Sequence, residues 1–528
     1  MKNILTKANS RVTVAWAAGL LAGAGLISSL LGLFRERLIL ANFGVGSEVD
    51  AYKAAFTVPD FMFFILVSGA FSVTFIPVFT QRIVAGNKKS AWKLTSSVLN
   101  FLAIVTAIAS ILIVIFAEPL IKYLIAPGFD QYTTQLAVDM MRIIAINPFL
   151  FAISSVLTSI QQAYGRFFFY SLAPSLYSIG IIFGILFLSP HFGIQGVAYG
   201  VAIGSVVQLI ASIVGMSGIG FKYTGKIFWK HKGFRKVLEL LPPRSFDQGI
   251  DYFHTLVEVN LASRLSAGMV TAYQTAFTLH WVPITLIGVA ISTASFPKLS
   301  ERISNNRPDL FKKDFLKMLR AIIWLALPTV VIAYFARGYL VRLLVAEGNP
   351  TIATLLGLLS VAIFFRAIFH LVTRAFYAQQ NTLTPLYVSA IGIPVIIFVA
   401  AYLSSPERYG VYGLAIAQSA VAVFEVTMLL SILSRQLGGL FTKSYINALV
   451  KMVSATGITS FVIYMLIAYI FPLQATDVGF FALAPKFLLI IVLSLMTYVF
   501  VSSLFKLEEA KPIVNQLKQT MFKTLKLS

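Results

Sequence analysis

Long apolar segments separated by short polar loops follow one another along the whole sequence. About 20 apolar residues in an α-helix span the hydrocarbon core of a bilayer, where a chain must satisfy its own backbone groups. The pattern therefore predicts an all-α polytopic membrane protein, which agrees with a composition of 58% hydrophobic and 12% charged residues. We predict fourteen transmembrane helices, at approximately residues 12–41, 53–80, 93–118, 133–160, 167–189, 194–217, 240–265, 268–297, 314–345, 351–377, 383–404, 410–434, 445–471 and 480–505.

Positive charge is concentrated in particular loops. The formal net charge of +22 would suggest nucleic acid in a soluble protein. Here the basic residues lie mostly in short loops between apolar segments, so we exclude a nucleic-acid partner. With the N-terminus inside, the inner segments carry 31 Lys and Arg residues and the outer segments 9. The positive-inside rule therefore predicts that both termini are cytoplasmic.

One segment of the chain repeats. Residues 72–83 (SVTFIPVFTQRI) recur 220 residues later as 292–303 (STASFPKLSERI). This spacing covers six crossings, an even number, so it predicts two six-helix lobes in a parallel repeat, followed by a final helix pair. We divide the chain into an N-terminal lobe (1–220), a basic cytoplasmic linker (221–237), a C-terminal lobe (238–437), helices 13 and 14 (438–506) and a basic cytoplasmic tail (507–528).

Four ionisable residues share one face of the predicted seventh helix. Asp247, Asp251, His254 and Glu258 fall at i, i+4, i+7 and i+11, between strongly apolar flanks. A charge that faces lipid at the bilayer centre costs at least ~2.5 kcal/mol, so we expect this face to line a wet cavity. The alternative is a set of buried ion pairs that holds two helices together. In transporters built from repeats the substrate site lies between the halves near the midplane, where this helix begins the second half.

A second charged group interrupts the first predicted helix. Arg35, Glu36 and Arg37 precede a short resumption of the apolar run, so two guanidinium groups lie partway across the membrane. An arginine in a dry cavity is a bidentate clamp suited to phosphate. The alternative is a pair that snorkels to the interface. Asp50 and Lys53 then open the second helix.

The later helices contain few charged residues. Arg366, His370 and Arg374 recur at every fourth position of the tenth helix and form a basic stripe. This stripe would complement either an acidic partner or an anionic head group. Glu425 stands alone in the twelfth helix, and we interpret it as a helix-packing hydrogen bond.

Enzyme signatures are absent or incomplete. Residues 220–226 match the opening of a phosphate-binding loop, but Ile227 stands where Ser or Thr would hold magnesium. The HExxH pattern is missing, the five histidines are scattered and there is no cysteine, so we expect no metal centre. A membrane glycosyltransferase or ligase would need acid/base groups in a sizeable outer loop, and the outer loops here are short. We predict no enzymatic activity and no cofactor.

Several short motifs resemble those of one family. They are LGLFR (31–35) with FG (43–44), VDAY (49–52) with VP (58–59), SGAFS (68–72) with FIP (75–77), APGF (126–129), APSL (173–176) and FYAQQNTLTP (376–385). In this order and spacing they make nearly the whole chain similar to the MviN/MurJ-like lipid II flippases of the multidrug/oligosaccharidyl-lipid/polysaccharide exporter superfamily. The resemblance implies fourteen helices in two six-helix lobes and a final pair that forms a groove.

The resemblance also implies a function. Such a flippase moves an undecaprenyl-pyrophosphate-linked peptidoglycan precursor, lipid II, from the inner to the outer leaflet by alternating access. The implied location is the bacterial cytoplasmic (inner) membrane, and the implied processes are peptidoglycan biosynthesis and the control of cell shape. The implied partners are the polyprenyl-pyrophosphate glycolipid, the bilayer and other cell-wall synthesis proteins. Export of another polyprenyl-linked glycan is the alternative.

Family members hold the pyrophosphate with several cavity arginines. Arg35 matches one of them and Asp50 matches a functional acid, but the expected positions of other clamp arginines are occupied by Ser29, Phe63 or Phe64, and Thr278. Either the clamp is rebuilt from Arg37, Lys53, Arg142, Arg244 or Arg264, or the cargo differs. The candidate substrate-binding residues are Arg35, Arg37, Asp50, Lys53, Arg244, Asp251, His254, Glu258 and Arg264. A coupling cation, sodium or proton, is expected near Asp247 and Asn381, although Asn381 is an amide where an acid is expected.

Overall fold

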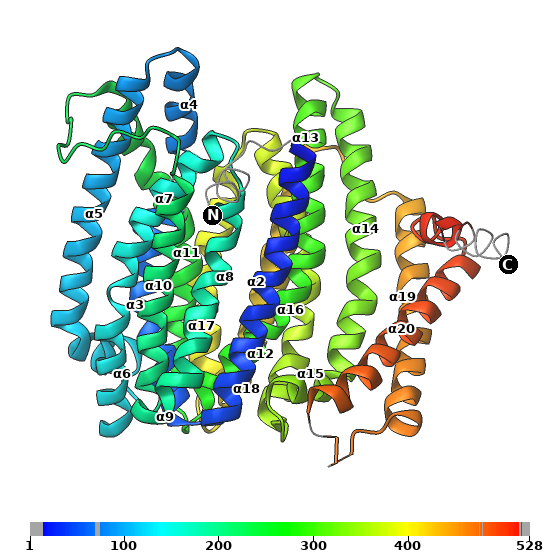
Figure 1. The fold of residues 1–528 in the computed structure, drawn as a ribbon. Helices are drawn as coiled ribbons and strands as arrows, with labels where there is room; N and C mark the ends of the chain where they lie inside the picture. The colour runs from blue at the N-terminus through cyan, green and yellow to red at the C-terminus, as the bar shows by residue number, and fades with distance from the viewer. Residues whose placement is uncertain (1–13, 69–73, 475, 478, 517–518, 520–528) are drawn as a thin grey trace, which may run out of the picture. The chain divides into compact units, whose positions relative to one another are not determined.

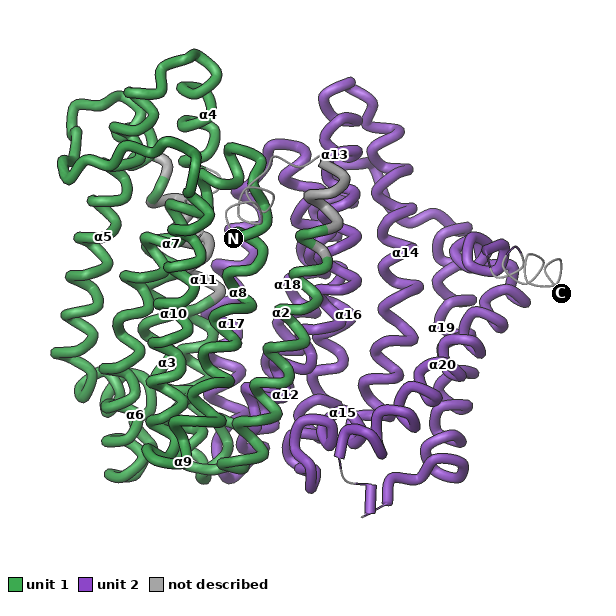
Figure 2. Tube along the Cα trace, in the orientation of Figure 1, with its two compact units in different colours: residues 1–271 green, residues 272–528 purple. Residues whose placement is uncertain are grey.

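The computed structural model describes residues 14–68, 74–474, 476–477, 479–516 and 519. The side chains of residues 14–19, 22, 68, 240 and 242–251 lie outside this description. Every regular element among the described residues is a helix (Figure 1). By their internal contacts the residues form two compact units, unit 1 (Met1–Thr271) and unit 2 (Ala272–Ser528), which Figure 2 distinguishes by colour.

Unit 1 is a bundle of α-helices, three of which continue into a π-helical turn. The α-helices are α2 (Val14–Phe43), α3 (Ser47–Phe63), α4 (Ile76–Val84), α5 (Lys88–Pro119), α6 (Gln131–Ile144), α7 (Asn147–Ala163), α8 (Phe168–Phe183), α9 (Ser189–Phe192), α10 (Gln195–Gly215) and α11 (Lys232–Ser263). The π-helical turns are η1 (Phe64–Ser68), η3 (Leu120–Ile125) and η4 (Gly184–Leu188). Phe79, Trp92 and Phe234 belong to a buried apolar cluster that joins α4, α5 and α11.

Unit 2 is a second helical bundle, and α12 enters it from unit 1. Its helices are α12 (Met269–Pro283), η5 (Ile284–Val289), α13 (Ala290–Ser304), α14 (Pro308–Phe335), α15 (Arg337–Leu344), α16 (Pro350–Ala378), α17 (Leu383–Leu403), α18 (Val411–Gln436), α19 (Lys443–Met465), η6 (Leu466–Ile470) and α20 (Phe480–Leu504). The last two α-helices pack on α14, where Trp324 Nε1 donates to Ser502 Oγ at 3.1 Å.

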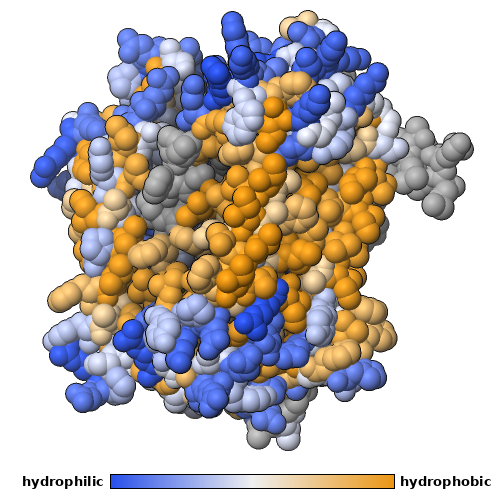
Figure 3. Space-filling model, turned by 90° about the vertical axis from the view of Figure 1, so that its left-hand side faces the viewer, coloured by the Kyte–Doolittle hydropathy of each residue, from blue (hydrophilic) through white to orange (hydrophobic). Residues whose placement is uncertain are grey.

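Eleven helical segments of the described chain are long and apolar enough to cross a membrane. The face in Figure 3 accordingly shows a hydrophobic band between hydrophilic ends. The three other predicted spans coincide with α2, with the α3–α4 segment and with α11. Residues 69–73 of the α3–α4 segment are not described, and α11 is rich in charged residues. The chain is therefore an all-α, multi-pass membrane protein.

The turn after α4 and the turn after α13 have the same hydrogen bonds. In each, the amides of the first three residues beyond the helix donate back to carbonyls of its last turn. The middle residue has a positive φ in both copies, +74° at Gly86 and +52° at Asn306. Glycine and asparagine are the residues that tolerate this conformation best. The sequence repeat therefore extends to the backbone geometry of this turn.

The contact-based boundary falls after α11, whereas the sequence repeat begins its second copy with this helix. In unit 1, α11 packs against α3, η1 and η3. One criterion follows contacts and the other follows internal symmetry, so the two need not agree. The division at residues 221–237 stays a prediction.

The backbones of α8 and α10 touch through glycines. A Cβ on Gly180 would lie 2.2 Å from Gly204 Cα, and a Cβ on Gly184 would lie 2.6 Å from Gly200 Cα. In each helix the two glycines are four residues apart and share one face. This arrangement lets two membrane helices approach more closely than any side chain would permit.

We predict that Gly200→Ala destabilises the protein, because the added methyl group would meet backbone atoms that cannot move aside without separating the helices. Overpacking of this kind typically costs ~1–3 kcal/mol. The measurement is the thermal unfolding midpoint of the purified protein in detergent. The matched control is Gly457→Ala in α19, where an added Cβ meets no atom within 4 Å. Equal midpoints for both variants would contradict the tight crossing.

Candidate functional site

Arg35 of α2 is a half-buried arginine inside unit 1. Its Nε is buried and has no hydrogen-bond partner among the described residues. The guanidinium interacts electrostatically with Asp60 of α3 and with the hydroxyl groups of Tyr52 and Tyr177. Arg35 therefore keeps a donor in reserve. A planar guanidinium with free donors is suited to binding two oxygens of one phosphate.

Glu36 and Lys53 form a buried ion pair between α2 and α3. Lys53 Nζ lies 2.6 Å from Glu36 Oε1, and both side chains are almost fully buried. Such a pair neutralises both charges, and removing one partner would leave the other buried and uncompensated. Lys53, a predicted substrate contact, is thus already engaged. Arg37 is half-buried and has interactions of its own.

Asp50 of α3 fastens the turn that leads into α12. Its carboxylate accepts hydrogen bonds from the amides of Gly268 and Thr271, at 2.6 and 2.7 Å, and from the Thr271 hydroxyl at 2.5 Å. The φ of Gly268 is +86°, a conformation that favours glycine. Asp50 is buried, so these three bonds replace its contacts with water. Asp50 therefore ties α3 to the first residues of α12.

A small polar cavity of about 180 Å³ adjoins Asp50. Asp130, at its edge, caps α6 by accepting a hydrogen bond from the Thr133 amide at 2.8 Å. Hydrogen bonds from Thr133 hold the pKa of the Asp130 carboxyl below its usual range. The cavity has room for several water molecules but not for a glycolipid head group. Its lining residues are Ser47, Asp50, Gly128, Phe129, Asp130, Thr133, Ser263, Leu265, Ser266 and Ala267.

The predicted stripe on α11 is described only in its second half. The side chains of Arg244, Asp247 and Asp251 lie outside the described residues. His254 is half-buried and Glu258 is buried, and both have partners within the structure.

The flanks of this half of α11 contact other elements of unit 1. The Tyr252 ring stacks on Phe64 of η1, with ring centroids 3.8 Å apart. Asn260 donates from Nδ2 to the Leu124 carbonyl at 2.7 Å, and the exposed Arg264 donates from Nε to Asn260 Oδ1 at 3.2 Å. Phe64, one of the two residues at which the family resemblance implies a clamp arginine, is therefore engaged in an aromatic stack.

Arg142 is an exposed member of a local ion pair. Its NH1 lies 3.7 Å from Asp139 Oδ1, three residues earlier on α6, and both side chains are exposed. Exposed pairs of this kind contribute little to stability.

Three uncharged residues near Arg35 were missed by the sequence analysis. Tyr177 of α8 accepts a hydrogen bond from Asn147 Nδ2 at 3.5 Å, and Ser205 of α10 donates to Asn147 Oδ1 at 2.7 Å. Tyr177, whose hydroxyl interacts electrostatically with Arg35, is thus linked through Asn147 of α7 to Ser205 of α10. Because none of them is charged, the only signal in the sequence is that each interrupts an apolar segment.

Glu425 of α18 has a partner on another helix. Its Oε2 accepts a hydrogen bond from Arg366 NH1 of α16 at 2.6 Å, so the predicted helix-packing hydrogen bond is confirmed. The Glu425 side chain is buried, the Arg366 side chain is 11% exposed, and the contact is also an ion pair. The partners are 59 residues apart in the chain, and the helical periodicity of one segment says nothing about contacts with another.

The rest of the basic stripe on α16 makes weaker contacts within unit 2. Arg374 lies over the Phe296 ring, 5.7 Å from its centroid, and the His370 ring lies 6.0 Å from the Trp281 ring. His280 of α12, which the sequence analysis did not single out, is fully buried, with Nδ1 2.5 Å from the Phe277 carbonyl oxygen. Arg366 alone of the three stripe residues is neutralised by a described carboxylate.

Asn381, one of the two predicted cation ligands, is engaged in a local cap. Its Oδ1 accepts from the Thr384 amide at 3.0 Å, and its Nδ2 donates to Thr384 Oγ1 at 2.9 Å. This is the N-terminus of α17. Among the described residues no group of three or more His, Cys, Asp and Glu side chains has a metal-binding arrangement.

Comparison with known proteins points to one family. A protein-family model described as lipid II flippase MurJ matches residues 39–484. The probable lipid II flippase MurJ of Buchnera aphidicola subsp. Schizaphis graminum is 29% identical over 374 residues, which cover 69% of this chain and 73% of that protein. The probable lipid II flippase MurJ of Bdellovibrio bacteriovorus is 25% identical over 460 residues, covering 84% and 87%.

Two solved structures are similar over most of the chain. Lipid II flippase MurJ in an inward closed conformation matches with a TM-score of 0.76 and 26% identity, covering 92% of this chain and 98% of that one. An inward-facing MATE family multidrug resistance transporter matches with a TM-score of 0.66 and 17% identity over 78% and 95%, which is a similarity of fold alone. Since the family model covers most of the sequence, the chain belongs to the lipid II flippase MurJ family.

Proposed function

We propose that this protein moves lipid II, an undecaprenyl-pyrophosphate-linked peptidoglycan precursor, from the inner to the outer leaflet of the bacterial cytoplasmic membrane. The observation that carries the proposal is the family match over residues 39–484. The structural similarity to a lipid II flippase MurJ, with a TM-score of 0.76, supports it. The family is one of transporters, so we assign no catalytic step to the chain.

Arg35 is the residue to which we assign the pyrophosphate. It is half-buried, carries a buried Nε without a hydrogen-bond partner among the described residues, and interacts electrostatically with the hydroxyl groups of Tyr52 and Tyr177. In a site with little water a charge-assisted hydrogen bond to phosphate is stronger than in solution. The neighbouring Glu36–Lys53 pair keeps Lys53 from competing for the same anion.

Asp50 is the residue to which we assign closure of the outer end of unit 1. Alternating access requires a contact that forms when that end closes and breaks when it opens. The three hydrogen bonds from Gly268 and Thr271 to one carboxylate are such a contact, because they hold the start of α12 on α3. Loss of these bonds frees the α11–α12 turn.

The proposed topology has fourteen transmembrane helices in the order six, six and two, with both termini cytoplasmic. The supports are the eleven long apolar helices, the helices at the three remaining predicted spans and the uneven distribution of Lys and Arg. The shared turn after α4 and α13 supports the repeat.

A coupling cation and further partners complete the proposal. Asp247 and Asn381 are the residues that we propose for binding the coupling cation, sodium or a proton. Asn381 Oδ1 at present accepts a hydrogen bond from the Thr384 amide. Other cell-wall synthesis proteins are the proposed partners.

Export of a different polyprenyl-linked glycan is the second candidate. The specific observation in its favour is that Phe64 and Tyr252 stack at 3.8 Å where the family resemblance implies a clamp arginine. A clamp with fewer cations would bind a head group with less negative charge. Replacing an essential lipid II flippase with this protein, and scoring survival, distinguishes the two cargoes.

We predict that a cysteine introduced by Gln131→Cys reacts with an impermeant thiol reagent added to whole cells, and that one introduced by Gly225→Cys does not. Both positions are exposed, and the chain has no cysteine of its own. Labelling after permeabilisation is the control for reactivity. The opposite pattern would overturn the orientation and, with it, the direction of transport.

We predict that Asp50→Asn accelerates hydrogen exchange at the amides of Gly268 and Thr271 and lowers flux. An asparagine amide nitrogen cannot accept the hydrogen bonds that the carboxylate accepts, and each buried donor left unpaired costs ~1–3 kcal/mol. Exchange is measured by mass spectrometry on the folded protein. Asp130→Asn is the control, because Asp130 borders the same cavity but caps α6 instead. Unchanged protection at residues 268–271 would remove Asp50 from the proposed closure.

We predict that Arg35→Lys loses most lipid II flux in reconstituted vesicles while the protein still accumulates. Lysine keeps the charge but lacks the planar fork that binds two phosphate oxygens. The control is Arg142→Lys, at an exposed ion pair where the shape of the cation matters little. Near-normal flux through Arg35→Lys would leave Arg35 with only a long-range electrostatic role.

A further inference from the structure

The α10–α11 linker, residues 216–231, is docked along the first half of α5. The Thr224 amide donates to Ser96 Oγ at 3.1 Å, and the Phe228 amide donates to Ser97 Oγ at 2.9 Å. Asn100 donates from Nδ2 to the Thr224 carbonyl at 2.9 Å. Backbone groups of the linker are thus paired with three side chains that lie within about one and a half turns of α5. The linker has a fixed position on this helix.

His231 fastens the end of the linker to two helices. Its Nδ1 accepts a hydrogen bond from the Phe234 amide and so caps α11, and its Nε2 lies 2.8 Å from Ser90 Oγ near the start of α5. Burial, with Arg82 and Lys93 nearby, lowers the pKa of His231, which favours the neutral ring that this pattern needs. The first turn of α11 is therefore held against the first turn of α5.

The surface around this linker is strongly basic, and the nearest acidic residue along the chain is the exposed Glu239 of α11. The α4–α5 turn and its flanks contribute Arg82, Lys88, Lys89 and Lys93, and the linker and the start of α11 contribute Lys222, Lys226, Lys230, Lys232, Arg235 and Lys236. No Asp or Glu occurs between residues 61 and 117, or between 217 and 238. Most of these basic side chains are exposed. The positive charge of this surface is therefore not neutralised by carboxylates from its own segments.

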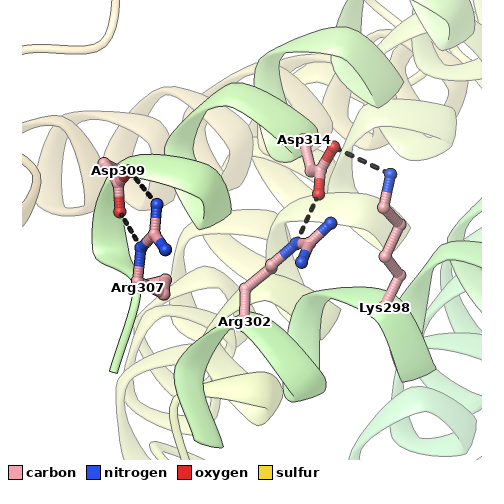
Figure 4. Close-up of polar contacts among 5 residues, drawn as sticks. All are labelled: Lys298, Arg302, Arg307, Asp309 and Asp314. Atoms are coloured by element: carbon pink, nitrogen blue, oxygen red, sulfur yellow. Dashed lines mark hydrogen bonds and ion pairs between the residues drawn. The ribbon is translucent and has the colours of Figure 1, made fainter. Parts of the chain in front are cut away.

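The equivalent turn of unit 2 neutralises its own charge. Asp314 accepts from Lys298 Nζ at 2.9 Å and from Arg302 Nε at 3.0 Å, and Arg307 pairs with Asp309 (Figure 4). The 220-residue repeat places Leu94 at the position of Asp314 and Lys89 at that of Asp309.

Unit 1 has Leu94 in place of Asp314, and Arg82 instead makes a hydrogen bond within its own helix, α4. It donates to the Val78 carbonyl at 2.6 Å. Its guanidinium also packs so closely on Gly233 that an added Cβ would lie 2.3 Å from NH2. The two copies of the repeat therefore differ in whether the chain supplies its own anions.

The position of the linker indicates which anion it meets. Trp229 and Tyr223 are 56% and 58% exposed on the linker, and exposed tryptophan and tyrosine favour the membrane–water interface. Little more than one turn beyond Asn100, α5 presents exposed apolar side chains, beginning with Ile104 and Ile108. The linker thus lies where a lipid-facing helix surface ends. Figure 3 shows this face, with hydrophilic side chains above the hydrophobic band.

We propose that the α10–α11 linker and the adjoining α4–α5 turn bind the anionic phospholipid head groups of the inner leaflet, and that this contact fixes the starting end of α11. Lysine and arginine side chains near an anionic membrane surface are each attracted to it, and the attraction adds over a cluster. Because α11 carries the ionisable stripe, its starting end is where lipid composition would act on the substrate pathway. The choice of leaflet rests on the proposed orientation, but head-group binding itself does not.

The test uses the full-length protein with a spin label on Gly225→Cys, an exposed site where an added Cβ would meet only the Tyr223 hydroxyl, at 4.0 Å. The protein is placed in nanodiscs of phosphatidylcholine alone or with phosphatidylglycerol. We expect phosphatidylglycerol to lower the collision of the label with a water-soluble relaxation agent and to raise its collision with oxygen. A triple variant carries Lys222→Gln, Lys226→Gln and Lys230→Gln. Its linker should partition to the phosphatidylglycerol surface roughly 100-fold less, so the response of the label should weaken. High salt should weaken it as well.

The matched control removes the same charge from unit 2 by Lys313→Gln, Lys317→Gln and Lys443→Gln, three exposed positions. This variant should respond to phosphatidylglycerol as the parent does. The proposal would be overturned if the label had the same collision rates in both nanodisc types. It would also be overturned if the unit 2 variant lost as much of the phosphatidylglycerol response as the linker variant. So would a label that stays in water and becomes immobilised only by a soluble acidic polypeptide. Transport is not measured, so failure here leaves the flippase proposal untouched.

Discussion

Charge that is buried away from water must be paired, and this requirement shapes the interior of both units. Lys53 with Glu36, and Arg366 with Glu425, each join two helices through an ion pair 2.6 Å long. Asp50 is satisfied differently, by donors of a turn whose glycine has a positive φ. Against this background Arg35 stands out, because one of its buried donors has no hydrogen-bond partner among the described residues. Paired groups hold helices together, whereas an incompletely satisfied cation is prepared for an external anion.

Much of the architecture could be predicted from local sequence, because helix length and apolar periodicity are local properties. The repeat was visible as well, and the shared turn after α4 and α13 follows from it. Arg35 and Asp50 were identified because an ion within an apolar segment is conspicuous. The pairing of Glu425 with Arg366 and the hydrogen bonds of Asn147 were not predictable, since each depends on how distant helices face one another. Asn381 is the opposite case. Its position three residues before Thr384 is enough to predict a local cap, whereas the sequence analysis considered only cation binding there.

The two copies of the repeat share the backbone geometry of the turn but differ in how their basic side chains are neutralised. Asp314 neutralises two basic side chains in unit 2, whereas Leu94 at the equivalent position of unit 1 is an apolar core residue. The backbone hydrogen bonds of the turn need neither side chain, so the substitution left the fold intact. It changed what the surface attracts. A repeated fold can in this way carry one surface whose basic side chains are neutralised by its own carboxylates and another whose basic side chains need anions from outside the protein.

The docking of α11 and its linker within unit 1 bears on how the chain is made. Helices enter the membrane in the order of synthesis, and a nascent chain that ended at Gly215 would contain α2 to α10 but not their later partners. Ser96, Ser97 and Asn100 would lack the linker, and Asp50 would lack Gly268 and Thr271. The amino-terminal bundle is thus completed only when about 55 further residues have been added, as far as Thr271. The ribosome must therefore deliver α11 and the start of α12 before α2 to α10 can reach their final packing.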